Sequence, residues 1–223
     1  MSIWPWSQNQ LLKKALAMYA GDHVLQRILR DGSVAFEPSS EVRDTTVAYF
    51  DAIPAFPYLS YSAFNEKLRV ALGGYREIVA TLVAEYRGNL DIFYGDSVIA
   101  WWTSATHAPD AISCALQIVK ALDEAGIAGA EAGMPALKAA IGVASNPMLI
   151  SNYGSTSRMR FAPLGEPLNL AARLSQRSNH KYPYPILTEE CTVRLLGPQF
   201  PVAHVDAVDM EGQERKVMLY GLG

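Results

Sequence analysis

The stretch "DIFYGDSVIAWW", residues 91–102, places a glycine and an aspartate between two runs of strand-forming residues. β-Branched and aromatic residues precede Gly95 and Asp96 and also follow them. Two such runs around a Gly-Asp pair predict a β-hairpin. The tip of this hairpin carries the carboxylate of Asp96, which raises the question of what the acid binds.

The overall composition is that of a globular protein with a single large core. The chain has 223 residues, half of them hydrophobic. A formal net charge of −3 gives no basic field that would indicate a nucleic-acid partner. The sequence contains neither a run of about 18 apolar residues nor a secretory signal, so we expect no membrane span. Cys114 and Cys191 lack metal-binding spacing and are expected to be reduced thiols of a cytoplasmic protein.

Segments with helical and strand-like patterns alternate along the chain. Two short helices are predicted within residues 8–31, so we expect residues 1–40 to form a helical lead-in to a domain at 41–223. The segment "TTVAYFDAI", residues 45–53, predicts a buried strand. The elements expected after it are a helix at 61–87, the hairpin, a helix at 108–126, two strands at 136–145 and 147–155, a helix at 165–178, a strand and a helix within 184–196, and a closing strand at 215–222. This order predicts an α+β fold with a ferredoxin-like βαββαβ core, in which helices pack on an antiparallel sheet.

Two aspartates stand at the ends of predicted strands. Asp51 follows "VAYF" and Asp96 follows "FYG". In a ferredoxin-like core the first strand lies beside the hairpin, so the two carboxylates can converge. Two hard oxygen ligands on rigid strands suit Mg²⁺ or Mn²⁺, with nucleotide phosphates completing the coordination. The alternative is that each acid only caps a turn.

A third group of polar residues lies in "PLGEPLNLAARLSQ". Asn169 and Arg173 are four residues apart, so they share one face of the predicted helix. Together they suit an anionic group and a ribose or ring oxygen. The alternative is the ordinary polar face of a surface helix.

Four motifs, in order, resemble the catalytic domain of class III nucleotidyl cyclases. "TVAYFD" is similar to the family's first metal-aspartate strand and "GDSVIAWW" to its hairpin. "IGVASNPMLISNYGS" and "FAPLGEPLNLAARL" are similar to the segments that follow in the family, the second of which contains its Asn-Arg helix. "MYAGDHVLQRILRDG" also resembles the helical lead-in found before such domains. The resemblance covers roughly residues 18–222 and identifies 41–223 as a cyclase catalytic domain.

The resemblance implies a head-to-tail homodimer with each active site between two chains. Asp51, Asp96 and the Ala52 carbonyl would hold two Mn²⁺ or Mg²⁺ ions per site. Asn169 of the other chain would orient the ribose, and Arg173 would stabilise charge on the phosphate oxygens. The implied reaction converts a nucleoside triphosphate to its 3′,5′-cyclic monophosphate and pyrophosphate.

Three residues depart from the family at positions expected to read the base. Ile92 stands where adenylate cyclases usually carry Lys, and Arg160 stands where they carry Asp or Thr. Ile92 cannot hydrogen-bond a base, and Arg160 only donates, which disfavours adenine and suits a carbonyl. Phe50 replaces a commonly small residue and is expected to crowd the pocket, which favours a one-ring base.

The chain therefore resembles the pyrimidine cyclases of bacterial Pycsar anti-phage systems, which signal to a separate effector. We predict UTP as the substrate, with CTP next. Alternatively, Arg160 contacts a phosphate or carboxylate while Phe50 and Ile92 only fill the core, and the protein is an ordinary adenylate or guanylate cyclase. A further alternative is a catalytically silent nucleotide-binding module that dimerises.

One more departure concerns the triphosphate. Many members of the family carry a phosphate-binding Lys just before a Gly near the C-terminus, whereas this chain has Glu211 before Gly212. Arg215 and Lys216 follow closely, but the sequence assigns neither of them to the site.

Overall fold

The computed structural model describes residues 7–54, 66–130, 136–155, 157–212 and 214–223. They form two compact units, Met1–Val42 with Leu149–Leu164, and Arg43–Met148 with Gly165–Gly223. Strands β1 and β4 each run from one unit into the other along the chain. No helix among the described residues has the length and hydrophobicity that crossing a membrane requires.

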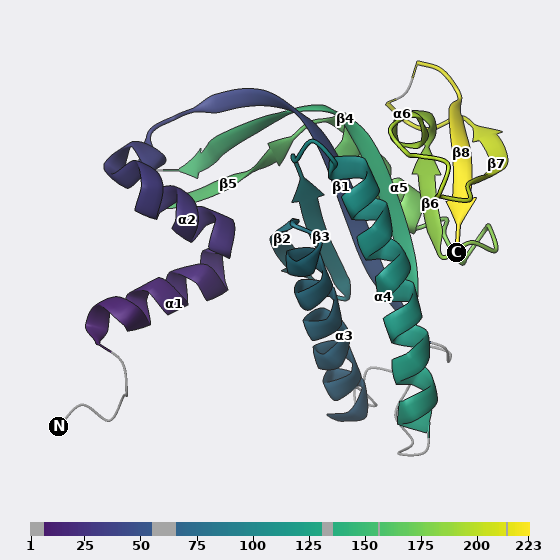
Figure 1. Ribbon diagram of the computed structural model, residues 1–223, viewed down its shortest axis with the longest axis horizontal. Helices are drawn as coiled ribbons and strands as arrows, with labels where there is room; N and C mark the ends of the chain where they lie inside the picture. Colours follow the sequence, from purple (N-terminus) through teal and green to yellow (C-terminus); the bar gives the residue numbers. More distant parts are fainter. Residues whose placement is uncertain (1–6, 55–65, 131–135, 156, 213) are drawn as a thin grey trace. The chain divides into compact units, whose positions relative to one another are not determined.

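The larger unit contains the predicted ferredoxin-like core. In chain order its elements are β1 (Ser40–Pro54), α3 (Glu66–Glu85), β2 (Asn89–Tyr94), β3 (Ser97–Trp102), α4 (His107–Ala130) and β4 (Leu137–Ser155). The strands lie in the order β2-β3-β1-β4, and β3 pairs antiparallel with both β1 and β2. Helices α3 and α4 run side by side over one face of this sheet (Figure 1). The α+β fold predicted from the sequence is confirmed.

Alternation along β1 and β3 separates the hydrophobic core from the opposite face of the sheet. Ala48, Phe50 and Ala52 of β1 belong to the core that α3 and α4 cover, together with Val98 of β3. Because successive side chains of a strand point to opposite faces, Asp51 points away from these two helices. The same argument places Ser97, the β3 partner of Asp51, on the face of Asp51.

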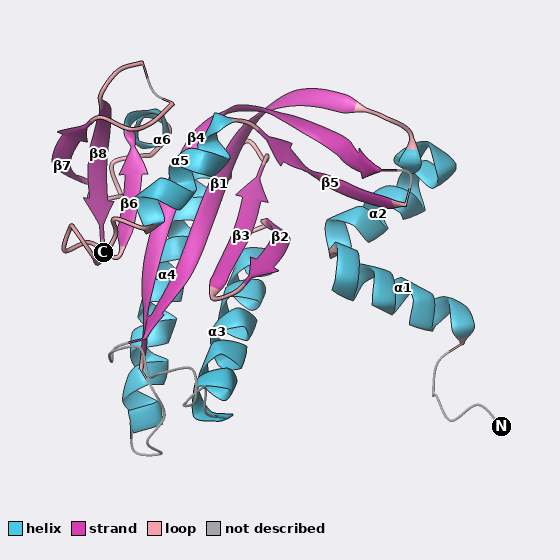
Figure 2. Ribbon diagram, turned by 180° about the vertical axis from the view of Figure 1, so that it is seen from behind, coloured by secondary structure: helices cyan, strands magenta, loops and turns pink. Residues whose placement is uncertain are grey.

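Helix α5 (Glu166–Ser175) covers that second face. Figure 2, viewed from behind, shows α5 in front of the strands and α3 and α4 behind them. The helix packs directly on β4 at Gly142, where an added Cβ would overlap the carbonyl oxygen of Ala171. Only glycine leaves room for this approach of backbone to backbone.

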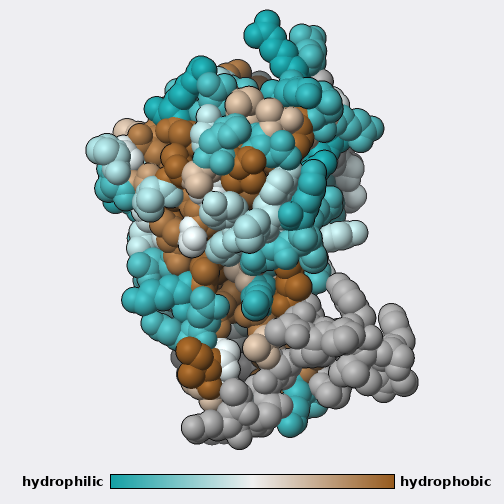
Figure 3. Space-filling view, turned by 90° about the vertical axis from the view of Figure 1, so that its right-hand side faces the viewer, coloured by the Kyte–Doolittle hydropathy of each residue, from teal (hydrophilic) through white to brown (hydrophobic). Residues whose placement is uncertain are grey.

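The C-terminal part of the chain extends the sheet. Its elements are β6 (Ile186–Glu189), α6 (Glu190–Arg194), β7 (Ala203–Val208) and β8 (Val217–Leu222). β6 pairs parallel with β4, and β8 pairs antiparallel with β6 and β7. The sequence had not predicted β7. Figure 3 shows one side of the molecule, on which hydrophobic residues lie among hydrophilic ones.

The smaller unit joins the N-terminal helices to a β-hairpin that is distant in the sequence. It contains α1 (Gln8–Ala20), α2 (Asp22–Asp31), the 3₁₀ helix η1 (Gly32–Phe36), the end of β4, and β5 (Arg158–Leu164). The side-chain amide of Asn152 donates to the carbonyls of Ala35 and Glu37, both at 2.8 Å. The Arg27 guanidinium lies 4.3 Å from the centre of the Phe161 ring. These contacts fasten the lead-in to the hairpin.

The predicted break between two strands near residue 146 is wrong. β4 is one strand that continues through Pro147, and its outer part pairs with β5, which the sequence had not predicted. Pro147 is exposed, and a strand tolerates proline where its missing N–H is not needed for pairing. The two predicted N-terminal helices are confirmed.

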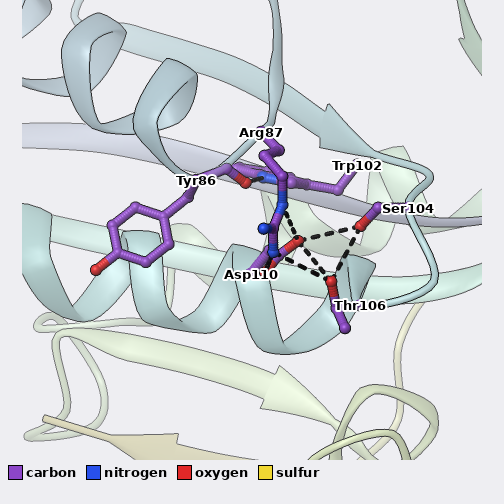
Figure 4. A network of polar contacts seen from close by, with 6 residues as sticks. All are labelled: Tyr86, Arg87, Trp102, Ser104, Thr106 and Asp110. Carbon is purple, nitrogen blue, oxygen red and sulfur yellow. Dashed lines mark hydrogen bonds and ion pairs between the residues drawn. The ribbon is translucent and has the colours of Figure 1, made fainter.

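A polar network connects the end of α3 with the start of α4 (Figure 4). Arg87 adopts the left-handed region with a φ of 61°, and its guanidinium contacts the Asp110 carboxylate at 2.6 and 3.3 Å. The hydroxyls of Ser104 and Thr106 donate to the same carboxylate at 3.0 and 2.9 Å. Asp110 is only 7% exposed, so this carboxylate satisfies several donors in a mostly buried place.

We expect Asp110→Ala to lower the free energy of unfolding by about 2–3 kcal/mol, because a guanidinium and two hydroxyls lose their common acceptor. Urea unfolding measures the loss. Glu124→Ala on the same helix is the control, since Glu124 pairs with Lys120 at 3.9 Å and both side chains are 67% exposed. This control is expected to cost less than about 0.5 kcal/mol. Equal losses in the two variants would contradict the assignment.

Candidate active site

Asp51 lies near the end of β1, with both carboxylate oxygens engaged. The hydroxyl of Ser97 on β3 donates to Oδ1, and the hydroxyl of Ser175 on α5 donates to Oδ2 at 2.7 Å. Both serines are buried, whereas Asp51 is half-buried. Two hydroxyls from different elements therefore fix the orientation of this carboxylate.

Asp96 occupies the turn of the predicted hairpin, which is confirmed. Gly95 has a φ of +63°, which the first central residue of a type II′ turn requires. The Arg76 guanidinium on α3 donates to the Gly95 carbonyl at 2.5 Å, and the Ala52 N–H donates to the Asp96 carbonyl at 3.3 Å. The first bond ties the turn to α3 and the second ties it to the end of β1, so Asp51 and Asp96 come from adjacent segments, as the sequence predicted.

The electrostatics of the pair favour a cation. Burial raises the pKa of the Asp51 carboxyl and the like charge of Asp96 adds to this effect, whereas the hydroxyls of Ser97 and Ser175 oppose it. Burial also raises the pKa of Tyr75 well above its usual value, and the charges of Asp51 and Asp96 add to the rise. The Tyr75 hydroxyl donates a hydrogen bond to the backbone carbonyl of Phe50, at 2.9 Å. A bound cation would offset the repulsion that both acids exert.

The donor set fits a magnesium or manganese ion only in part. Within the described ranges, no group of three or more His, Cys, Asp and Glu side chains is placed to hold a metal. The sequence-predicted ligands are the Asp51 and Asp96 carboxylates and the Ala52 carbonyl, and their joint binding of an ion stays a prediction. This is the kind of site in which Mg²⁺ keeps water or takes substrate phosphates as further ligands.

Asn169 and Arg173 lie on α5, on the side of the helix away from Ser175. Asn169 is exposed, and Arg173 retains 32% of its side-chain exposure. The Arg173 guanidinium pairs with Glu211 at 3.3 Å, and the Glu211 side chain is 93% exposed. Glu211, which replaces the expected lysine, therefore contacts the arginine predicted to bind phosphate.

The three residues predicted to read the base have different surroundings. Phe50 is completely buried in the core, which agrees with the alternative that it fills the interior. Ile92 is half-buried on β2, opposite Ile99 of β3. Arg160 lies on β5 in the smaller unit, opposite Tyr153, and its guanidinium lies 5.9 Å from the centre of the Tyr153 ring. Their grouping in one base pocket stays a prediction.

Sequence reasoning missed both serines that hold Asp51. Ser97 directly follows Asp96, and pairing the hairpin with β1 would have placed it opposite Asp51. Ser175 gives no comparable signal. It contacts Asp51 across 124 positions of the chain, so only the packing of α5 on the sheet reveals it.

The chain is similar to known proteins in sequence and in fold. No family model matches the chain. Adenylate cyclase 1 of Rhizobium meliloti (strain 1021) is 25% identical over 162 residues, which are 71% of this chain and 24% of the relative. The chain thus spans about a quarter of that protein's length.

Solved structures share the architecture. A bacterial light-regulated adenylyl cyclase matches 96% of this chain and 60% of its own, with a TM-score of 0.83 and 21% identity. The guanylyl cyclase Cya2 matches 82% of this chain and 95% of its own, with a TM-score of 0.70 and 22% identity. The fold is that of the class III nucleotidyl cyclase catalytic domain. The chain is thus similar in sequence to a protein named adenylate cyclase, and similar in fold to an adenylyl and a guanylyl cyclase structure.

The raised pKa of Asp51 gives a prediction for stability. A carboxyl with a raised pKa in the folded state favours folding while it is protonated, and this contribution is lost as the pH rises through the folded-state pKa. Without divalent cations, we expect Asp51→Asn to raise the free energy of unfolding at pH 7. This gain in the free energy of unfolding should shrink as the pH falls below the pKa of the Asp51 carboxyl in the folded protein. Urea unfolding at pH values about one unit apart, between pH 4 and pH 7, measures the difference in the free energy of unfolding between variant and wild type.

Asp206→Asn is the control with the opposite sign. The Tyr182 hydroxyl donates to Asp206 at 2.6 Å and holds the pKa of that carboxyl below its usual value. Its contribution is present at pH 7 and is lost as the pH falls through the folded-state pKa, so this variant should be less stable at pH 7. An Asp51→Asn variant that is less stable than the wild type at pH 7 would contradict the prediction.

Proposed function

We propose that this chain is a nucleotidyl cyclase that converts a nucleoside triphosphate to its 3′,5′-cyclic monophosphate and pyrophosphate. The observation that carries the proposal is that the end of β1 with Asp51 pairs with the hairpin turn that carries Asp96, whose charge acts on the Asp51 carboxyl. A half-buried carboxylate beside a second one is a costly arrangement that a bound cation compensates. The sequence relatives named adenylate cyclase support the same reaction.

The active form is a head-to-tail homodimer. The Asp51 carboxylate accepts from Ser97 and Ser175, whereas Asn169 is exposed and Arg173 pairs with Glu211. This arrangement supports a site to which one chain contributes the two acids and its partner the Asn-Arg face of α5. A chain with this division of roles is incomplete alone.

Each residue has a defined task in the reaction. Asp51, Asp96 and the Ala52 carbonyl would hold two Mn²⁺ or Mg²⁺ ions, which when bound supply Lewis acidity at the ribose 3′-hydroxyl and neutralise triphosphate charge. Asn169 orients the ribose so that the 3′-oxygen is in line with the α-phosphorus. A bond forms between these two atoms, the bond from the α-phosphorus to the leaving oxygen breaks, and the hydroxyl proton passes to solvent. Arg173 donates to the phosphate oxygens on which charge grows.

We further propose a pyrimidine nucleotide as the substrate, UTP before CTP. Ile92 has no hydrogen-bonding group to recognise a purine edge, and Arg160 has only donors, which suit the carbonyls of uracil. The buried Phe50 no longer contributes to this argument. If the product is cyclic UMP, the resemblance to Pycsar cyclases extends to a cytoplasmic second messenger for anti-phage defence, detected by a separate effector.

The second candidate is an ordinary purine cyclase. The comparison proteins bear the names of adenylate and guanylyl cyclases, which favours ATP or GTP. The product of the reaction distinguishes the two candidates.

Incubation of the purified protein with ATP, GTP, CTP and UTP separately, each with Mn²⁺, tests the reaction by mass analysis of the products. We expect cyclic UMP as the main product and none from Asp51→Ala, which should still dimerise. Cyclic AMP or cyclic GMP alone would contradict the pyrimidine assignment. Product formation by Asp51→Ala would contradict the metal-site assignment.

Arg160→Gln tests the reading of the base. A glutamine amide both donates and accepts, so it also suits the amino group of cytosine. We expect the ratio of kcat/KM for UTP to that for CTP to fall roughly tenfold. Arg158→Gln is the control, because Arg158 is an exposed arginine of the same strand. An unchanged ratio in Arg160→Gln would remove Arg160 from base recognition.

A further inference from the structure

Ser175 occupies an unusual position between the two halves of the proposed machinery. It is fully buried at the last residue of α5, and its hydroxyl lies 2.7 Å from Asp51 Oδ2 and 2.9 Å from the Ala172 carbonyl. A hydroxyl has one proton, so it can donate fully to only one of these oxygens at a time. Because both oxygens lie within hydrogen-bonding distance, the hydroxyl nevertheless connects the carboxylate on β1 with the backbone of α5.

The packing of α5 makes this bridge rigid. At Gly142 the helix backbone lies so close to β4 that a Cβ would overlap the carbonyl oxygen of Ala171 and crowd the backbone nitrogen of Ser175. Leu170, Ala171 and Leu174 are buried on the same helix. Displacement of the last turn of α5 would consequently move the hydroxyl away from Asp51.

The opposite side of α5 carries the residues predicted to act on the substrate. Arg173 and Ser175 are two positions apart, which is about 200° around a helix, and Asn169 shares the face of Arg173. A single rigid helix thus connects the Asp51 carboxylate with the side chains assigned to the ribose and phosphate.

We propose that Ser175 is a positioning residue that orients the Asp51 carboxylate for a divalent cation and couples the cation to the position of α5. This inference rests on the proposed function, because it takes Asp51 as a metal ligand. Residues that hydrogen-bond a metal ligand orient it and raise metal affinity. In the homodimer, α5 would then belong to two sites, through Ser175 to its own chain's acids and through Arg173 to its partner's.

Metal affinity is the first test. We expect Ser175→Ala to weaken Mn²⁺ binding roughly tenfold, as measured by calorimetry or by the electron paramagnetic resonance signal of free Mn²⁺. Ser178→Ala is the matched control, because Ser178 is also fully buried, but its hydroxyl donates to the carbonyls of Tyr184 and Pro185. Equal Mn²⁺ affinities in the two variants would overturn the proposal.

Hydrogen exchange of α5 tests the coupling. Mn²⁺ should slow amide exchange over residues 166–175 in the wild type and not in Ser175→Ala. Ser97→Ala removes the other hydroxyl on Asp51, from β3, so it should weaken Mn²⁺ binding yet retain the slowing in α5 once the ion is bound. If Ser175→Ala also retains it, the link through α5 is wrong.

The Asp51→Ala variant separates this inference from the proposed function. If the wild type does not bind Mn²⁺, or if Asp51→Ala binds it equally well, the metal site itself is wrong. If Asp51→Ala loses binding and Ser175→Ala does not, only the role of Ser175 fails.

Discussion

The approach of α5 to Gly142 is the contact on which the site depends. The backbones of α5 and β4 are in direct contact there, with no side chain between the helix and the sheet. The backbone of α5 consequently lies directly against β4, and Ser175 reaches Asp51 from there. Interiors are packed closely enough that a displacement at such a contact is transmitted rather than absorbed. The glycine at this point of β4 therefore serves the placement of polar groups as much as the packing of the core.

The alternation of β1 and β3 explains why acids and core coexist in a few residues. Phe50 and Ala52 point to the helices α3 and α4, while Asp51 between them points to α5. A slip of one residue in the pairing with β3 would bury the carboxylate in the core and expose Phe50. The register is thus strongly fixed, and it costs stability, because burial raises the pKa of Asp51. A residue that lowers the stability of the fold in this way is typical of a functional site.

The predictable parts of this chain are those whose signals are local. Gly95 and Asp96 mark a hairpin because the turn geometry depends on adjacent residues, and the spacing of Asn169 and Arg173 fixes a shared helix face. The sequence analysis predicted a strand at 147–155 but not β5, the strand that pairs with that part of β4. Ser175 was not predicted because its partner Asp51 lies in another element. The burial of Phe50 removes one of the three residues from the base pocket, which had been inferred from the sequence alone.

The pairing of Arg173 with Glu211 does not remove this arginine from the proposed chemistry. The carboxylate is 93% exposed, and ion pairs at such exposure contribute about 0–1 kcal/mol. A triphosphate presents several negative charges and accepts hydrogen bonds from a guanidinium in a bidentate manner, which is stronger than a single exposed contact. The substrate would therefore displace Glu211 at little cost. In the proposed reaction, Glu211 would thus be a weak partner that the guanidinium exchanges for the triphosphate.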